Sequence, residues 1–219
     1  MQRRLVGFRY RIWQNEGKWV IIENRLGKGA MQYMKRSVRE FLILLALAII
    51  IFVGLRSTIQ TFVVYGPSME PNFGDQQRLL VNKLVYKIHE PERGDVIVFH
   101  PPDRMRDSYI KRIIGLPGES VSIEDGEVHI HKPDGSVLVL DEPYVTDVAN
   151  SPYIGFPIPE NEYFVLGDNR NNTNDSRNGW RVPDENIIGK TWLSIWPPDK
   201  WGLAANYPLK EQIANATNE

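Results

Sequence analysis

The sequence predicts a mainly β protein, with a single N-terminal transmembrane helix followed by an all-β domain. The first observation is a continuous apolar run from Phe41 to Leu55. The second is the series of short β-branched and aromatic runs after it, each bounded by Gly, Pro or Asp. The third is a pair of hairpin signals in close succession, at Asp125-Gly126 and Asp134-Gly135. With 219 residues, 42% of them hydrophobic, the chain is long enough for a packed core plus appendages.

Residues 1–37 are expected to form a basic N-terminal segment on the cytoplasmic side. Lys35, Arg36 and Arg39 flank the start of the apolar run, and the positive-inside rule places such a cluster in the cytoplasm. This composition fits a lipid-associating segment or a solvated basic tail. A third alternative is that the assigned start codon lies upstream of the true start, which would be Met31 or Met34. The segment is therefore given no function.

Residues 38–61 are expected to form the transmembrane helix. The 15 apolar residues from Phe41 to Leu55 are fewer than the roughly 20 that a span needs. A longer helix reaches across if the Arg56 side chain extends to the far interface. A buried core helix is the alternative, but the run is not amphipathic. No convincing small-x-small cleavage site follows, so an uncleaved anchor is favoured over a signal peptide.

Residues 62–205 are expected to form an extracytoplasmic β domain, and residues 206–219 a polar C-terminal tail. The two Asp-Gly signals predict a meander within the domain. Three tryptophans near its end, Trp192, Trp196 and Trp201, fit lipid contact and core burial equally well. The expected strands are Arg78–Tyr86, Val96–Phe99, Tyr109–Ile114, Val121–Ile123 and Tyr163–Leu166.

Charge and cysteine content exclude several classes of function. A formal net charge of −1 argues against a nucleic-acid partner. With 0 cysteines, the chain has no disulfide, no thiolate nucleophile and no cysteine-ligated metal. His129 and His131 alternate on an expected strand without a third ligand nearby, so no metal site is expected there.

The segment Gly66-Pro67-Ser68-Met69-Glu70-Pro71 follows the apolar run and offers a serine as a candidate nucleophile. A serine hydroxyl needs a base to remove its proton, and the spacing of the four histidines does not by itself establish a Ser-His-Asp triad, which stays a weak alternative. A lysine in apolar surroundings loses its charge more readily and is then a base. Lys111 lies in a strand otherwise suited to burial, although a solvated face is the usual place for a strand lysine.

The loop from Gly167 to Arg177 (GDNRNNTNDSR) is rich in hydrogen-bonding side chains. A calcium loop is disfavoured, because the glycine and terminal glutamate of an EF-hand are missing. We expect a hydrogen-bonded scaffold in which Asp175 pairs with an arginine while Thr173 reaches a lysine amine.

Together, GPSMEP, RGDVIVFHPP leading into YIKRIIGLPG, and GDNRNNTNDSR resemble the boxes of type I signal peptidases. The resemblance covers roughly residues 35 to 200 of these membrane-anchored Ser-Lys proteases, and three boxes in order are more specific than one. It implies a signal-peptidase-like catalytic domain, with Ser68 as nucleophile and Lys111 as general base. It also implies that the backbone N–H of Ser68 binds the oxyanion. Gly66 stands where some members carry a serine that helps to bind the oxyanion.

The resemblance extends to the neighbouring residues. It places Met69 and Tyr109 near the substrate and gives supporting positions to Thr173, Asp168, Arg170, Asp175 and Arg177.

The resemblance also implies substrates, partners and location. The substrates are signal-peptide-bearing pre-proteins, cleaved after small-x-small sites, and the lipid bilayer is the other partner. No metal or organic cofactor is needed. The location is a bacterial plasma membrane or a thylakoid-type internal membrane. Two alternatives remain: a self-cleaving Ser-Lys protease of the SOS-repressor type, and an inactive membrane-anchored binding protein with the same fold.

Overall fold

The structure is a computed structural model that describes residues 9–14, 17–23 and 26–206. The chain divides into two compact units, Met1–Gly54 and Leu55–Glu219. Of the expected C-terminal tail, residues 207–219 lie outside the described residues, as do residues 1–8, 15–16 and 24–25 of the N-terminal segment.

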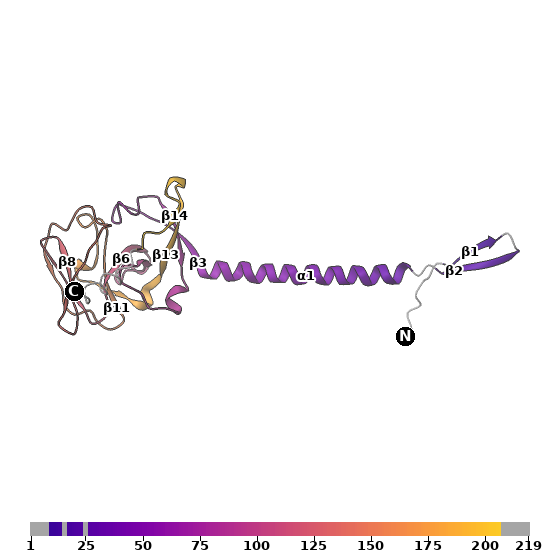
Figure 1. The fold of residues 1–219 in the computed structure, drawn as a ribbon, viewed down its shortest axis with the longest axis horizontal. Helices are drawn as coiled ribbons and strands as arrows, with labels where there is room; N and C mark the ends of the chain where they lie inside the picture. The colour runs from indigo at the N-terminus through magenta and orange to yellow at the C-terminus, as the bar shows by residue number, and fades with distance from the viewer. Residues whose placement is uncertain (1–8, 15–16, 24–25, 207–219) are drawn as a thin grey trace. The chain divides into compact units, whose positions relative to one another are not determined.

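The first unit contains an antiparallel hairpin of β1 (Arg9–Gln14) and β2 (Lys18–Glu23), which the sequence analysis did not predict. Helix α1 (Leu26–Thr58) begins after it and continues into the second unit (Figure 1). Its segment Arg36–Gly54 has 19 residues, a mean hydropathy of 2.3 and no buried side chains. By length and composition, this segment is able to cross a membrane.

Helix α1 differs at both ends from the expected helix over residues 38–61. It begins earlier, at Leu26, and ends at Thr58. The residues from Ile59 onward belong to β3 (Ile59–Val63), which pairs with β4 (Arg78–Asn82) from Ile59 opposite Asn82. Pairing with β4 gives these residues ladder hydrogen bonds that a continued helix would have to replace.

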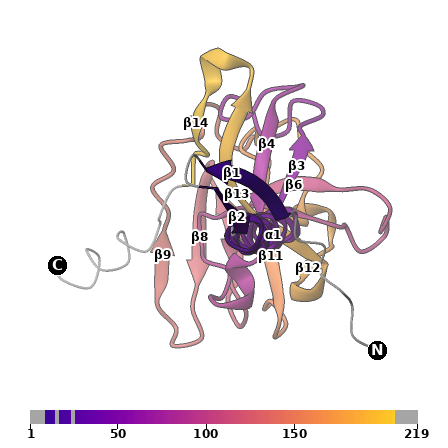
Figure 2. The same ribbon diagram turned by 90° about the vertical axis from the view of Figure 1, so that its right-hand side faces the viewer.

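The second unit is all-β apart from short 3₁₀ turns and the end of α1, as predicted. Its larger sheet runs in the order β12-β11-β6-β5-β13-β4-β3, with β14 paired to β13. Most of these strands are labelled in Figure 2. The remaining strands of this sheet are β5 (Val96–Phe99), β6 (Tyr109–Gly115), β11 (Glu162–Leu166), β12 (Val182–Pro183), β13 (Ile187–Trp196) and β14 (Gly202–Leu203).

A smaller sheet has the order β10-β7-β8-β9. Its strands are β7 (Ser120–Glu124), β8 (Glu127–His131), β9 (Val137–Val139) and β10 (Tyr153–Ile154). The predicted meander is present, because Asp125 and Gly126 connect β7 to β8 with φ of 50° and 86°. Two successive positive φ values favour Asp-Gly at this turn.

Three apolar clusters fill the second unit. One packs the smaller sheet against β11, through Ile123, Ile130 and Phe164. Another lies around Met69, Phe73 and Leu79, beneath the chain that follows β3. The third cluster lies around Phe99, Ile113, Tyr163 and Val165. Strand β6 extends between these clusters, which explains how it holds buried residues on both faces.

Two expectations about individual residues are corrected. The expected strand Arg78–Tyr86 ends at Asn82, and the short 3₁₀ helix η1 (Val85–Lys87) follows it. The three tryptophans are 44 to 68% exposed, so the core alternative is wrong for Trp192, Trp196 and Trp201.

Candidate active site

Ser68 lies in a tight loop that continues from β3. Backbone hydrogen bonds between Val64 and both Gln76 and Gln77 close the base of this loop. Within the loop Gly66 has φ of 79°, a left-handed conformation that favours glycine. Met69 is fully buried, which fixes the backbone directly after the serine, while Ser68 itself stays half-buried.

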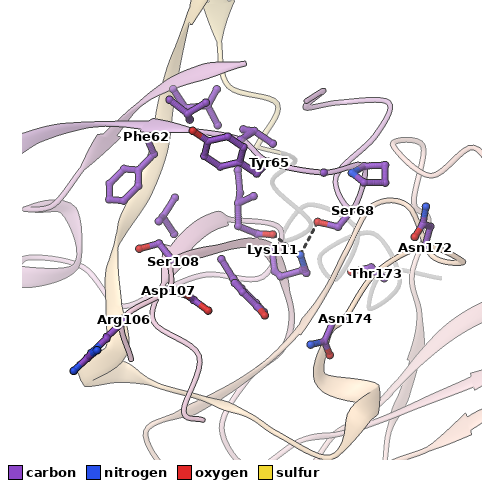
Figure 3. A pocket seen from close by; sticks show the side chains of 18 of the residues that line it. Phe62, Tyr65, Ser68, Arg106, Asp107, Ser108, Lys111, Asn172, Thr173 and Asn174 are labelled. Carbon is purple, nitrogen blue, oxygen red and sulfur yellow. Dashed lines mark hydrogen bonds between the residues drawn. The ribbon is translucent and has the colours of Figure 1, made fainter. Parts of the chain in front are cut away.

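Lys111 reaches Ser68 from strand β6, 43 residues later in the sequence. Its Nζ donates to Ser68 Oγ at 2.7 Å and to the Ile110 carbonyl at 2.8 Å. The two side chains point toward one another in Figure 3. The ring of Tyr109 lies 5.7 Å from the amine. The lysine is only 4% exposed, so its amine is held in one position against the hydroxyl.

Burial changes the acidity of this amine. Desolvation lowers the pKa of Lys111 from 10.5 to about 8, although the negative charges of Asp175 and Asp168 act in the opposite direction. At pH 7 about a tenth of the amine is therefore uncharged, and the uncharged fraction reaches about half near pH 8. An uncharged amine accepts a proton from the serine hydroxyl, which a lysine of ordinary pKa does far less often.

Gly167 at the end of β11 allows the loop after it to approach the serine. A Cβ at this position would lie 2.5 Å from the Ser68 carbonyl oxygen and would also collide with Thr173 Oγ1. The amide of Asn169 donates to the same carbonyl oxygen at 3.2 Å. This close contact is therefore possible only because Gly167 has no side chain.

Gly167→Ala is expected to lower kcat by about 100-fold, because the new methyl group must displace the backbone that carries Ser68, the expected nucleophile. The matched control is Gly74→Ala, whose Cβ meets only the flexible end of Lys200 at 3.1 Å. Steady-state kinetics with the kind of substrate that the resemblance implies, a presequence peptide, checks both variants. A fully active Gly167→Ala enzyme would show that this close approach is not needed.

Thr173 does not make the hydrogen bond expected for it. The amine of Lys111 contacts Ser68 and Ile110 instead, and Thr173 Oγ1 is buried without a partner among the described residues. Thr173 packs against Gly167 and lines the same cleft as the serine and the lysine. The expected hydrogen bond from Thr173 to the amine is therefore absent in this structure.

Asp168 forms a buried, bidentate ion pair with Arg112, the neighbour of Lys111. Arg112 Nε and Nη2 donate to the two carboxylate oxygens at 2.8 and 2.6 Å, with side chains 0% and 1% exposed. Asn72 Nδ2 donates to the same carboxylate at 2.8 Å, and the ring of Tyr144 lies 4.0 Å from the guanidinium carbon. These contacts connect the serine loop, β6 and the Gly167 loop.

The other charged residues of the loop are also paired. Arg170 forms a buried ion pair with Glu142, with contacts of 2.6 and 2.5 Å. The predicted pairing of Asp175 with an arginine is present, because Arg177 Nε and Nη2 each lie 2.9 Å from its carboxylate. Asp175 also accepts from the Gly167 amide at 3.2 Å. The loop is therefore held from several sides.

Four of these partners were not found by sequence reasoning. Asn72 and Arg112 lie beside motif residues, but nothing in their spacing indicates that both contact Asp168. Glu142 and Tyr144 lie in a loop whose composition does not indicate a functional site. Their contacts with Arg170 and Arg112, which are distant in sequence, were therefore not predicted.

The serine and lysine line a cleft of about 980 Å³. One wall is formed by β3 and the residues after it, including Phe62 and Tyr65, and the other by the segment from Arg106 to Lys111 (Figure 3). Tyr109, expected near the substrate, lines this cleft. Met69 does not line it and is buried in an apolar cluster, so its position does not support substrate contact.

No group of three or more histidine, aspartate or glutamate side chains among the described residues is placed to hold a metal ion. Comparison with known families then decides the assignment. The family model described as "Signal peptidase, peptidase S26" matches residues 34–196. The chain belongs to the signal peptidase I family. It is therefore a serine peptidase, and neither the repressor-type nor the inactive binding-protein alternative holds.

Named relatives cover most of the chain. "Probable signal peptidase I-2" of Synechocystis sp. is 34% identical over 172 residues, 76% of this chain and 77% of the relative. "Signal peptidase I" of Leptolyngbya laminosa is 34% identical over 166 residues, 72% of this chain and 79% of the relative. "Signal peptidase IB" of Staphylococcus aureus is 31% identical over 183 residues, 75% and 92% of the two chains.

Among solved structures, a signal peptidase I from Enterococcus faecalis V583 is 30% identical. That alignment covers 47% of this chain and 97% of the other, with a TM-score of 0.41.

Proposed function

We propose that this signal peptidase cleaves the signal peptides of exported pre-proteins, with Ser68 as nucleophile and Lys111 as general base. The observation that carries the proposal is the 2.7 Å contact between Ser68 Oγ and the buried Lys111 amine. No histidine lines the cleft, and of the ionisable residues that do, Lys111 is the one that contacts the Ser68 hydroxyl.

The first half of the reaction forms an acyl-enzyme. Neutral Lys111 accepts the Ser68 hydroxyl proton while Oγ attacks the carbonyl carbon of the scissile peptide bond. The resulting ammonium then donates this proton to the leaving amine, which becomes the new N-terminus of the mature protein. The signal peptide stays on Ser68 as an ester. The second contact of Nζ, to the Ile110 carbonyl, keeps the amine directed at the reacting atoms.

The backbone N–H of Ser68 is the donor proposed for the oxyanion. It makes no other hydrogen bond within the described part of the chain. Pro67 has no N–H, and the Gly66 N–H donates to Asp75 Oδ1 at 2.8 Å. Gly66 therefore contributes neither a side chain nor a free amide, and the Ser68 N–H carries more of the stabilisation of negative charge.

The second half of the reaction hydrolyses the ester. A water molecule attacks the acyl carbon and gives its proton to neutral Lys111, and the Ser68 oxygen leaves and regains a proton from the lysine. The released products are the signal peptide, with a new carboxyl end, and the free enzyme. The same amine thus serves as base and acid in both halves.

An extended substrate segment fits the free edge of β6. Tyr109, Ile110 and Lys111 pair with β5 on one side, whereas the pairing with β11 begins only at Arg112. No strand among the described residues pairs with the other edge of these three residues, although the Ile110 carbonyl accepts from Lys111 Nζ. This edge borders the cleft, and we expect a peptide strand to pair there. Alternating side chains of such a strand would point into the cleft, in keeping with small residues at the first and third positions before the cut.

Membrane anchoring by α1 completes the proposal. The segment Arg36–Gly54 would cross a bacterial plasma membrane or a thylakoid-type membrane, with the residues before Arg36 on the cytoplasmic side. Pre-proteins are held at the same membrane by their signal peptides. Anchoring therefore raises the effective concentration of enzyme and substrate toward each other.

The proposed function is tested with the purified full chain in neutral detergent and a synthetic presequence that contains an Ala-x-Ala site. Mass spectrometry of the products is expected to show a single cut after the second alanine. Presequences with a bulky residue at either alanine position serve as controls and are expected to remain intact. Absence of cleavage, or equal cleavage of the controls, would contradict the proposal.

The pH dependence of kcat/KM is expected to follow the Lys111 amine. Its pKa is lowered to about 8, so the active neutral form increases with pH and activity rises through about pH 8. Asp175→Asn is expected to move this midpoint to lower pH, because the carboxylate raises the lysine pKa. A rate profile from pH 6 to 10 checks both statements, and a flat profile would contradict the role of Lys111 as base.

A further inference from the structure

A second cavity, of about 470 Å³, shares Phe62 and Ser108 with the substrate cleft. Two lysines, Lys83 and Lys87, lie on its lining together with the side-chain amide of Gln60. This cavity is distinct from the proposed catalytic dyad, because neither Ser68 nor Lys111 lines it. No step of the cleavage reaction uses these lysines.

The charge of the cavity favours an anion. Both lysine side chains are exposed, and neither makes an ion pair with a carboxylate in the part of the chain that the structure describes. Ammonium groups donate several hydrogen bonds each, and Gln60 and Ser108 add neutral donors beside them. Two unpaired ammonium groups with neutral donors suit a phosphate group, whose oxygens accept several hydrogen bonds.

Apolar residues flank the same lysines. Leu84 and Ile88 lie on either side of η1, which carries Lys87, and are 37% and 76% exposed. A soluble phosphate would gain nothing from these side chains. An interfacial segment that carries both cations and exposed apolar residues is typical of contact with the boundary between headgroups and acyl chains.

The chain connectivity places this cavity beside the end of the proposed anchor. The Lys83 amide donates to the carbonyl oxygen of Thr58, the last residue of α1, at 2.8 Å. Thr58 lies four residues after Gly54, where the membrane-length apolar segment ends. Gln60 belongs to the cavity and follows Thr58 by two residues. The cationic cavity is therefore next to the point where the chain leaves the bilayer.

We propose that this cavity binds the phosphate headgroup of an anionic phospholipid, with Lys83 and Lys87 as the principal ligands. The lipid belongs to the leaflet that faces the peptidase domain, and its acyl chains lie toward Leu84 and Ile88. The proposal rests on the proposed membrane anchoring by α1. A bound lipid would hold β3 and η1, and with them one wall of the substrate cleft, at the bilayer surface.

The test uses the full chain in neutral detergent and native mass spectrometry with added phosphatidylglycerol, phosphatidylcholine or inorganic phosphate. Phosphatidylglycerol is expected to bind wild type more tightly than either other probe. Lys83→Gln with Lys87→Gln should weaken its binding by about 30-fold, or about fivefold for each lysine. The matched control, Lys132→Gln with Lys200→Gln, removes the same charge away from the cavity and should leave the binding unchanged.

Unchanged binding in the first double variant, or equal loss in the control pair, would overturn the site. Inorganic phosphate that binds as tightly as phosphatidylglycerol would show a site for free anions instead. Vesicle flotation of the same variants, after the detergent is removed in the presence of lipid, tests the anchor, and failure to float would remove the membrane basis of the proposal. Presequence cleavage in detergent is expected to be unchanged in both double variants. Loss of wild-type cleavage with intact lipid binding would overturn the proposed function alone.

Discussion

Ser68→Ala and Lys111→Met are each expected to lower kcat/KM for presequence cleavage by about 10⁴-fold or more, and combining them should cost little further activity. The two groups act on the same proton, so removal of either one disables the other. Because Lys111 Nζ and Ser68 Oγ lie 2.7 Å apart, we do not expect the two side chains to contribute independently to the rate. Independent contributions would instead multiply when the two substitutions are combined. Steady-state kinetics of both single variants and the double variant measures the difference.

Two further variants sharpen this double-mutant cycle. Lys111→Arg should be as inactive as Lys111→Met, because a guanidinium does not accept a proton near neutral pH. Lys132→Met removes a half-buried lysine outside the cleft and should leave the rate unchanged. An active Lys111→Arg enzyme would assign the base to another group. Multiplicative losses in the double variant would separate Ser68 from Lys111 in the mechanism.

Arg112→Met is expected to lower the free energy of unfolding by about 3–5 kcal/mol, because it leaves the fully buried carboxylate of Asp168 without its cation. Two further hydrogen bonds, to the carbonyls of Gly94 and Ala205 at 2.9 Å, are also lost. Arg112→Met combined with Asp168→Asn should be less destabilised than Arg112→Met alone, since no buried charge then remains unpaired. Urea unfolding followed by tryptophan fluorescence gives the free energies.

Arg181→Gln is the matched control for this substitution. Arg181 also lies over an aromatic ring, 4.7 Å from that of Phe164, but it makes no ion pair with a carboxylate within the described residues. We expect its loss to cost about 1 kcal/mol. Equal destabilisation by the two substitutions would show that ring packing and hydrogen bonds, rather than the buried ion pair, account for the effect at Arg112.

The fold was predictable where a signal is local. The observed strands β5, β6, β7 and β11 coincide closely with the expected ones. Runs of β-branched residues and Asp-Gly turns predict the structure of the segment in which they occur, without information from distant parts of the chain. Strand β13 was not expected, although it pairs with β4, β5 and β14. Register shifts interrupt its pairing, so its side chains do not follow a simple alternation that the sequence would reveal.

The site was predictable in its residue types but only partly in its contacts. Ser68 and Lys111 do meet, and Asp175 does pair with an arginine. The missing contact of Thr173 depends on the side-chain position of Lys111, which spacing along the chain does not determine. Met69 likewise follows the nucleophile in sequence, but the loop turns its side chain into the core.

The short connection between α1 and the nucleophile limits which bonds are accessible for cleavage. Ser68 lies ten residues after Thr58, the end of the helix. Even a fully extended chain of that length spans only about 35 Å, whatever the orientation of the β domain. For an anchored enzyme, this length is an upper limit on the height of the catalytic serine above the end of its own helix. Bonds held farther than this above the end of the helix would remain uncut, even after a suitable small-x-small sequence.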